Sequence, residues 1–113
     1  MPMERRPQDP QPTADMGRHL EQLAEISVSG RRLPVEDLEG LRQLAAAAAG
    51  RGTALRFLLA EYLASAGRVW ADLPDVPQAQ EAQELKAVAS TLIRAIGDAT
   101  VALTEGYETA HRA

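Results

Sequence analysis

The chain has no cysteine and few aromatic residues among its 113 positions. The lack of cysteine excludes disulfides, thiolate zinc sites, iron–sulfur clusters and a cysteine nucleophile. Aromatic residues make up 4% of the chain, whereas apolar residues make up 45%, with alanine at 21 positions. Small side chains bury little area each but let helix axes approach closely. The composition therefore predicts a core of closely spaced helices.

Lysine occurs once, at Lys86, beside eleven arginines, and the net charge is −4. Binding of nucleic acid needs a concentrated basic face, which argues against nucleic acid as a partner of this acidic chain. Uninterrupted apolar runs of membrane-spanning length are lacking, so no membrane span is predicted. Arg5 and Arg6 are not followed by a hydrophobic segment, so no cleavable signal peptide is predicted. We expect a small, acidic, bacterial-type protein in the cytoplasm, or one exported without such a peptide.

Two stripes of small and apolar residues recur at steps of three and four, one from Leu38 to Leu73 and one from Ala82 to Ala110. This spacing keeps one seam of a helix facing a partner helix. The stripes predict long helices over 34–72 and 76–111, joined at a turn that contains Pro74 and Pro77. A short loop between long helices makes them antiparallel neighbours, so an all-α hairpin is expected.

The N-terminal part carries a proline-rich segment, residues 1–12, that predicts a disordered tail. Apolar residues at helical spacing then predict a short helix over about 14–28, which ends where Gly30 supplies a left-handed cap. Residues 13–113 are expected to form a single helical domain.

The segment 50–53 allows two interpretations. Gly50 could cap one helix and Thr53 could begin the next, which would give a four-helix bundle. The apolar spacing passes through Gly52 without a break, however, and an internal glycine costs only about 1 kcal/mol relative to alanine. This continuity favours one continuous helix over 34–72.

No motif with catalytic, cofactor-binding or metal-binding spacing was found. His19 and His111 lie far apart in the sequence and are expected on exposed helix surfaces. The serines and threonines have no nucleophile motif and no neighbouring base, and the glycines form no phosphate-binding loop. The sequence therefore predicts a non-enzymatic protein with no cofactor.

Residues 34–112 resemble the Trp-x-Gly helical hairpins, the small early-secreted-antigen-type substrates of type VII secretion. The resemblance rests on two helices of similar length, with Trp70-Ala71-Asp72 at the turn and Tyr107-Glu108-Thr109-Ala110-His111 near the end. Asp72 stands where the family has glycine, and His111 stands where the family has an acidic residue. The resemblance implies dimerisation through the hairpin face.

The function expected from these observations is protein–protein association, with the chain itself or with another helical protein, because one hairpin cannot cover all of its apolar faces. The residues expected to form the interface are the large apolar ones of the seams: Leu38, Leu41, Leu55, Leu59, Trp70, Leu92, Ile96 and Leu103. The alternative is a regulatory bundle that binds a small apolar or anionic molecule in a pocket near Arg56 or Arg94, since arginine suits the recognition of anions.

Overall fold

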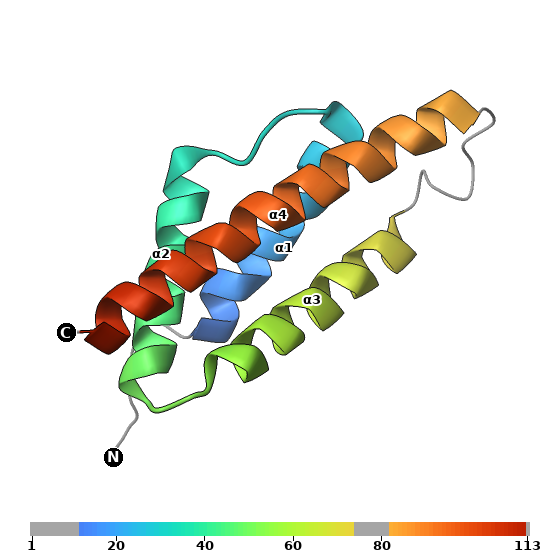
Figure 1. The fold of residues 1–113 in the computed structure, drawn as a ribbon. Coiled ribbons are helices and arrows are strands. Elements are labelled where there is room, and N and C mark those ends of the chain that lie inside the picture. Colours follow the sequence, from blue (N-terminus) through green and yellow to red (C-terminus); the bar gives the residue numbers. More distant parts are fainter. Residues whose placement is uncertain (1–11, 74–81, 113) are drawn as a thin grey trace, which may run out of the picture.

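The computed structural model describes residues 12–73 and 82–112. In this part of the chain it has four helices and no strand: α1 (Pro12–Ser29), α2 (Val35–Gly50), α3 (Leu55–Asp72) and α4 (Ala82–Arg112) (Figure 1). The prediction of an all-α fold is confirmed, and α1 corresponds to the short helix expected over 14–28. The predicted tail lies outside the described residues except for Pro12, and so does the predicted turn at Pro74 and Pro77.

The single helix predicted over 34–72 is wrong, and the four-helix alternative is confirmed. α2 ends at Gly50. The amide of Gly52 then donates to the carbonyl of Ala49, and the amide of Thr53 donates to the carbonyl of Ala48, each at a distance of 3.0 Å. This pair of hydrogen bonds closes a helix only when the residue after the cap has a left-handed backbone conformation. Gly52 is that residue, and its φ is +83°. The linker 51–54 is about as long as one helical turn, so the apolar spacing continues across it and hides the break.

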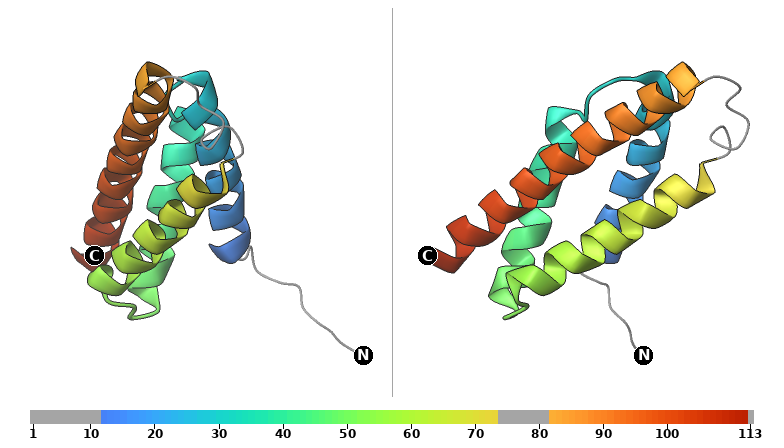
Figure 2. Two further views of the ribbon diagram at one scale, coloured as in Figure 1. Left: turned by 90° about the vertical axis from the view of Figure 1, so that its right-hand side faces the viewer. Right: turned by 45° about the vertical axis from the view of Figure 1, so that its right-hand side comes forward.

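The helices alternate in direction, with α1 and α3 running one way and α2 and α4 the other (Figures 1 and 2). This is the up-down-up-down order of a four-helix bundle. α3 and α4 form the antiparallel pair that the sequence predicts for its hairpin. The most extensive packing, however, joins α2 to α4, and α3 lies at the edge with fewer contacts to the rest.

The core is made of leucine, isoleucine and alanine from all four helices, with one tyrosine. Its buried members are Leu23, Ile26, Leu33, Leu41, Leu44, Ala45, Tyr62, Ala66, Leu92, Ala95, Ala99, Ala102 and Leu103. Alanine supplies five of these positions, in agreement with the predicted close spacing of the helices. α1, the short helix that precedes the predicted hairpin, contributes the fully buried residues Leu23 and Ile26 to the core.

α4 approaches the backbone of α2 closely where Gly106 faces Arg42. A Cβ atom placed on Gly106 would come within 2.7 Å of both the Cα and the carbonyl carbon of Arg42, and closer still to its carbonyl oxygen. No real Cβ atom tolerates such contacts, so glycine at this position sets the distance between the two helices. The Arg42 side chain also contacts Glu105 over 3.2 Å.

Candidate functional site

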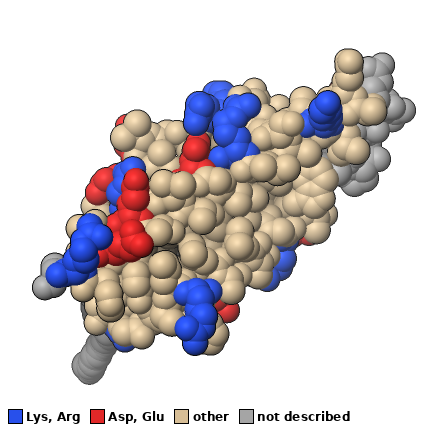
Figure 3. Space-filling view, viewed as in Figure 1, with Lys and Arg blue, Asp and Glu red and all other residues tan. Residues whose placement is uncertain are grey.

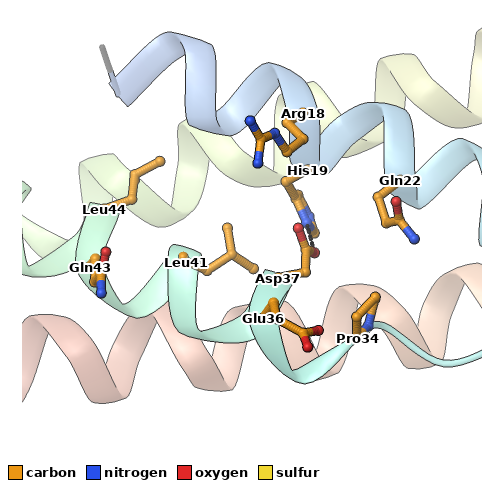
Figure 4. Close-up of a pocket in the computed structure, with 10 residues that line it drawn as sticks. Arg18, His19, Gln22, Pro34, Glu36, Asp37, Leu41, Gln43 and Leu44 are labelled. Atoms are coloured by element: carbon orange, nitrogen blue, oxygen red, sulfur yellow. Dashed lines mark hydrogen bonds and ion pairs between the residues drawn. The ribbon is translucent and has the colours of Figure 1, made fainter. Parts of the chain in front are cut away.

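A buried polar chain of three side chains crosses the centre of the bundle. His19 of α1 is 1% exposed, and its Nδ1 atom lies 2.6 Å from Oδ2 of Asp37 in the first turn of α2 (Figure 4). The Nε2 atom of the same ring lies 2.9 Å from the hydroxyl of Tyr62 on α3. One imidazole thus connects three helices through its two ring nitrogens.

The local sequence explains why His19 points inward. It lies three residues after Met16 and four before Leu23, on the apolar face of α1, so the helix directs it to the same side as these core residues. The prediction that His19 is an exposed surface histidine is therefore wrong, because the spacing of its apolar neighbours outweighs its polarity. His111 is exposed as expected, and its ring stacks on Tyr107 at a centroid distance of 5.8 Å.

The polar chain is satisfied by its own members. A carboxylate accepts, so Nδ1 of His19 donates to Asp37, and the hydroxyl of Tyr62 can donate to a neutral Nε2. Burial raises the pKa of Tyr62, and the negative charge of Asp37 raises that pKa further. Tyr62 therefore stays protonated well above neutral pH and keeps a hydroxyl proton that it can donate in this hydrogen bond.

A polar cavity of about 280 Å³ opens beside this chain, between α1 and the N-terminal half of α2 (Figure 4). Arg18, Gln22, Glu36 and Gln43 line it together with His19. Charges of both signs border the cavity, so it has no marked preference for anions or cations. In the described residues, no group of three His, Asp or Glu side chains is placed to hold a metal ion.

A second cavity, of about 410 Å³, lies between α1, α3 and the end of α2, and Tyr62 forms part of its wall. Its walls are mainly apolar and include Met16, Leu20, Ala48, Phe57 and Leu58. Phe57 is 68% exposed, so a large aromatic ring stands at the rim of the cavity.

Arg56 and Arg94, where the sequence places a small-molecule site, are not brought together at a cavity. Both residues are exposed, and neither lines the polar cavity or the apolar cavity. The cavities are bordered by other arginines, Arg18 in the polar one and Arg51 in the apolar one.

The eight predicted interface residues fall into two groups. Leu41, Leu92 and Leu103 are buried in the core of the chain. The other five are partly buried: Leu38, Leu55, Leu59, Trp70 and Ile96. Trp70 and Ile96 also border a groove of about 320 Å³ between α3 and α4, together with Ile93 and small residues. The role of these residues in binding a partner stays a prediction.

The outward face of α4 exposes large apolar side chains. Ile93 is 69% exposed and Val101 is 56% exposed. In Figure 3 uncharged residues cover the middle of this face, and charged residues lie around it, most of all toward the C-terminal end of α4. An 18-residue window of α4 has a hydropathy of 1.3 with only 28% of it buried. By length and composition alone this is the one helix of the described residues that could cross a membrane, a criterion that core helices of soluble proteins also meet.

Comparison with known families identifies the family of this chain. Residues 1–113 match the family described as the RsbT co-antagonist protein rsbRD N-terminal domain. The chain belongs to this family. No curated protein and no solved structure matches it. The RsbT co-antagonist rsbRD N-terminal family indicates a regulatory protein of the stressosome type, in agreement with protein–protein association and with partners that are proteins.

The resemblance to the Trp-x-Gly secretion substrates is wrong. The family match covers the whole chain and belongs to a different group. The structure gives the physical reason, because the break at Gly52 leaves no long first helix to match that hairpin. Trp70 lies near the end of α3, an 18-residue helix, and faces the groove between α3 and α4.

Proposed function

We propose that this chain is a non-enzymatic regulatory domain that acts by pairing with helical proteins, a second copy of itself among them. The family match supports a regulatory role. The observation that carries the proposal is the outward face of α4, where Ile93 and Val101 keep more than half of their surface exposed. Contiguous exposed apolar side chains are typical of interaction surfaces.

The buried polar chain supports a structural rather than a catalytic role for the only buried histidine of the described residues. Both ring nitrogens of His19 are engaged, by Asp37 and by Tyr62, and the ring is 1% exposed. A general base needs a free nitrogen within reach of a substrate. The histidine instead connects α1, α2 and α3 by hydrogen bonds, so a shift of one of these helices would strain its bonds to the other two.

The test is a measurement of mass in solution by sedimentation or light scattering, from low to high micromolar concentration. We expect a concentration-dependent dimer or higher assembly. The chain should also be recovered with a helical protein of its own regulatory system after affinity capture. A strict monomer over the whole concentration range that captures no partner would overturn the proposal.

A second function is favoured by the apolar cavity beside Tyr62. Its volume of about 410 Å³ is within the range of about 300–1,000 Å³ that is usual for small-molecule sites. A ligand in this cavity would contact α1, α2 and α3 at once, so its binding could change how these helices support the outward face of α4. The test is a thermal-shift screen with small apolar and aromatic metabolites, with Leu58→Gln as the variant that should abolish any shift.

A further inference from the structure

The outward face of α4 follows a regular pattern that is symmetric in the sequence. We call this face the α4 seam and define it by seven residues: Lys86, Ser90, Ile93, Gly97, Val101, Thr104 and Glu108. Six of them are exposed, and Thr104 is partly buried. At about 100° per residue the seam stays within about 40° of Gly97, on the side of α4 opposite to its buried residues.

The residue types of the seam match when the order is reversed around Gly97. Ile93 and Val101 each lie four positions away, Ser90 and Thr104 each lie seven away, and Lys86 and Glu108 each lie eleven away. The matched pairs are two branched aliphatic residues, two hydroxyl residues and two opposite charges. A surface that faces itself across a two-fold axis needs this kind of self-complementarity.

We propose that α4 pairs with α4 of a second copy in an antiparallel contact whose two-fold axis passes beside Gly97. This inference rests on the proposed function and gives it a specific partner and register. Ile93 of one copy then contacts Val101 of the other, and Lys86 meets Glu108 at both ends. A parallel arrangement is disfavoured, because it would place Lys86 beside Lys86 and Glu108 beside Glu108.

Gly97 supports a close contact at the axis. A Cβ atom on Gly97 would meet nothing within 4 Å, so packing inside the chain does not require glycine there. Glycine within a helix costs about 1 kcal/mol relative to alanine. In the antiparallel pair the missing side chain lets the two backbones approach, as Gly106 does for α2 and α4 within one chain.

The seam is long enough for a specific contact. The 22 residue steps from Lys86 to Glu108 correspond to about 33 Å of helix. Beside its centre, Ile93 borders the apolar groove between α3 and α4, which Trp70 also lines. Among the seven seam residues the apolar ones lie at the centre and the charged ones, Lys86 and Glu108, at the two ends, which is an arrangement typical of protein interfaces.

The first experiment reverses the charges at the ends. We expect Lys86→Glu and Glu108→Lys each to weaken dimerisation by about tenfold, because each variant creates two like-charge contacts in its homodimer. An equimolar mixture of the two variants restores both pairs in the mixed dimer, and so does the double variant with itself. In a parallel dimer the mixture would also recover, but the double variant would stay weak.

The second experiment examines the centre of the seam. Ile93→Glu should weaken dimerisation by at least about tenfold, since it places a carboxylate in the apolar contact. Val35→Glu is the matched control, because Val35 is 75% exposed on α2 and lies outside the seam. In this cysteine-free chain Gly97→Cys should form a disulfide-linked dimer on mild oxidation, and Val35→Cys should not.

The outcomes separate this inference from the proposed function. A wild-type chain that stays monomeric while capturing a helical partner would refute self-pairing through α4 and keep the regulatory association role. A wild-type dimer that is unaffected by Ile93→Glu and is not cross-linked through Cys at position 97 would place the dimer contact elsewhere on the molecule. Folding of each variant is checked by circular dichroism, and the Gly97→Cys result stands even if Ile93→Glu fails to fold.

Discussion

The Nε2 atom of His19 lies 2.9 Å from the hydroxyl of Tyr62, so an imidazole on α1 and a phenol on α3 meet inside the bundle. α3 lies at the edge of the bundle and makes fewer packing contacts than α2 and α4 make with each other. This hydrogen bond therefore fixes the position of the helix that is least held by apolar packing. Asp37 completes the connection by holding the opposite side of the imidazole.

Removal of the Tyr62 hydroxyl should destabilise the fold. Tyr62→Phe keeps the ring but leaves Nε2 of His19 buried without a partner, which costs about 1–3 kcal/mol of unfolding free energy. The comparison is Tyr107→Phe, which removes a hydroxyl that donates to the carbonyl of Thr53 over 2.7 Å at a partly buried site. Urea denaturation should show a larger loss for Tyr62→Phe, and equal losses would contradict the importance assigned to the buried chain.

The raised pKa of Tyr62 predicts a loss of stability in alkali. Burial, and secondly the charge of Asp37, raise the pKa of Tyr62 in the folded state above the value of about 10 for an unfolded chain. Its contribution to stability is therefore complete below pH 10 and is lost as the pH rises toward the folded pKa. Above pH 10 the unfolding free energy should fall by up to about 1.4 kcal/mol per pH unit more in the wild type than in Tyr62→Phe. Parallel pH profiles for the two proteins would contradict this assignment.

The sequence predicts the helices better than their junctions. The all-α class, the first helix and the left-handed glycine at Gly30, with a φ of 81°, follow from local rules of spacing and capping. The break between α2 and α3 is the less favoured of the two interpretations of 50–53, because the four-residue linker preserves the apolar phase. Periodicity reports which residues face the core, and it does not report whether the backbone between two such residues is helical.

The sequence does not reveal the buried polar chain. His19 and Tyr62 are 43 positions apart, so only the packing of α1 on α3 brings them together. The spacing from Met16 to Leu23 could have identified His19 as an inward-facing residue. In the sequence, Asp37 has only the features of a charge at a helix N-terminus, and its bond to His19 is seen only in the folded chain.

The turn between α2 and α3 should require glycine at position 52 but not at position 50. Gly52→Ala forces a side chain into the left-handed region and should cost about 1 kcal/mol or more of unfolding free energy. Gly50→Ala is the matched control, because Gly50 is the last helical residue of α2 and has open space around its Cβ position. Thermal unfolding should show a lower midpoint for Gly52→Ala, and an unchanged or higher midpoint for Gly50→Ala. A higher midpoint for both would mean that residues 51–54 prefer the continuous helix.

The approach of Gly106 to Arg42 should make Gly106 the least replaceable glycine of α4. The Cβ atom of Gly106→Ala would overlap the backbone of Arg42, which cannot rotate away, so α2 and α4 must separate along their main contact. Forced overpacking of this kind costs about 1–3 kcal/mol, and more when backbone must move. Gly40→Ala is the control, because its Cβ meets nothing within 4 Å and alanine favours the helix by about 1 kcal/mol. The two variants should therefore shift the urea midpoint in opposite directions, and a stabilised Gly106→Ala protein would mean that α2 and α4 do not pack at the distance described.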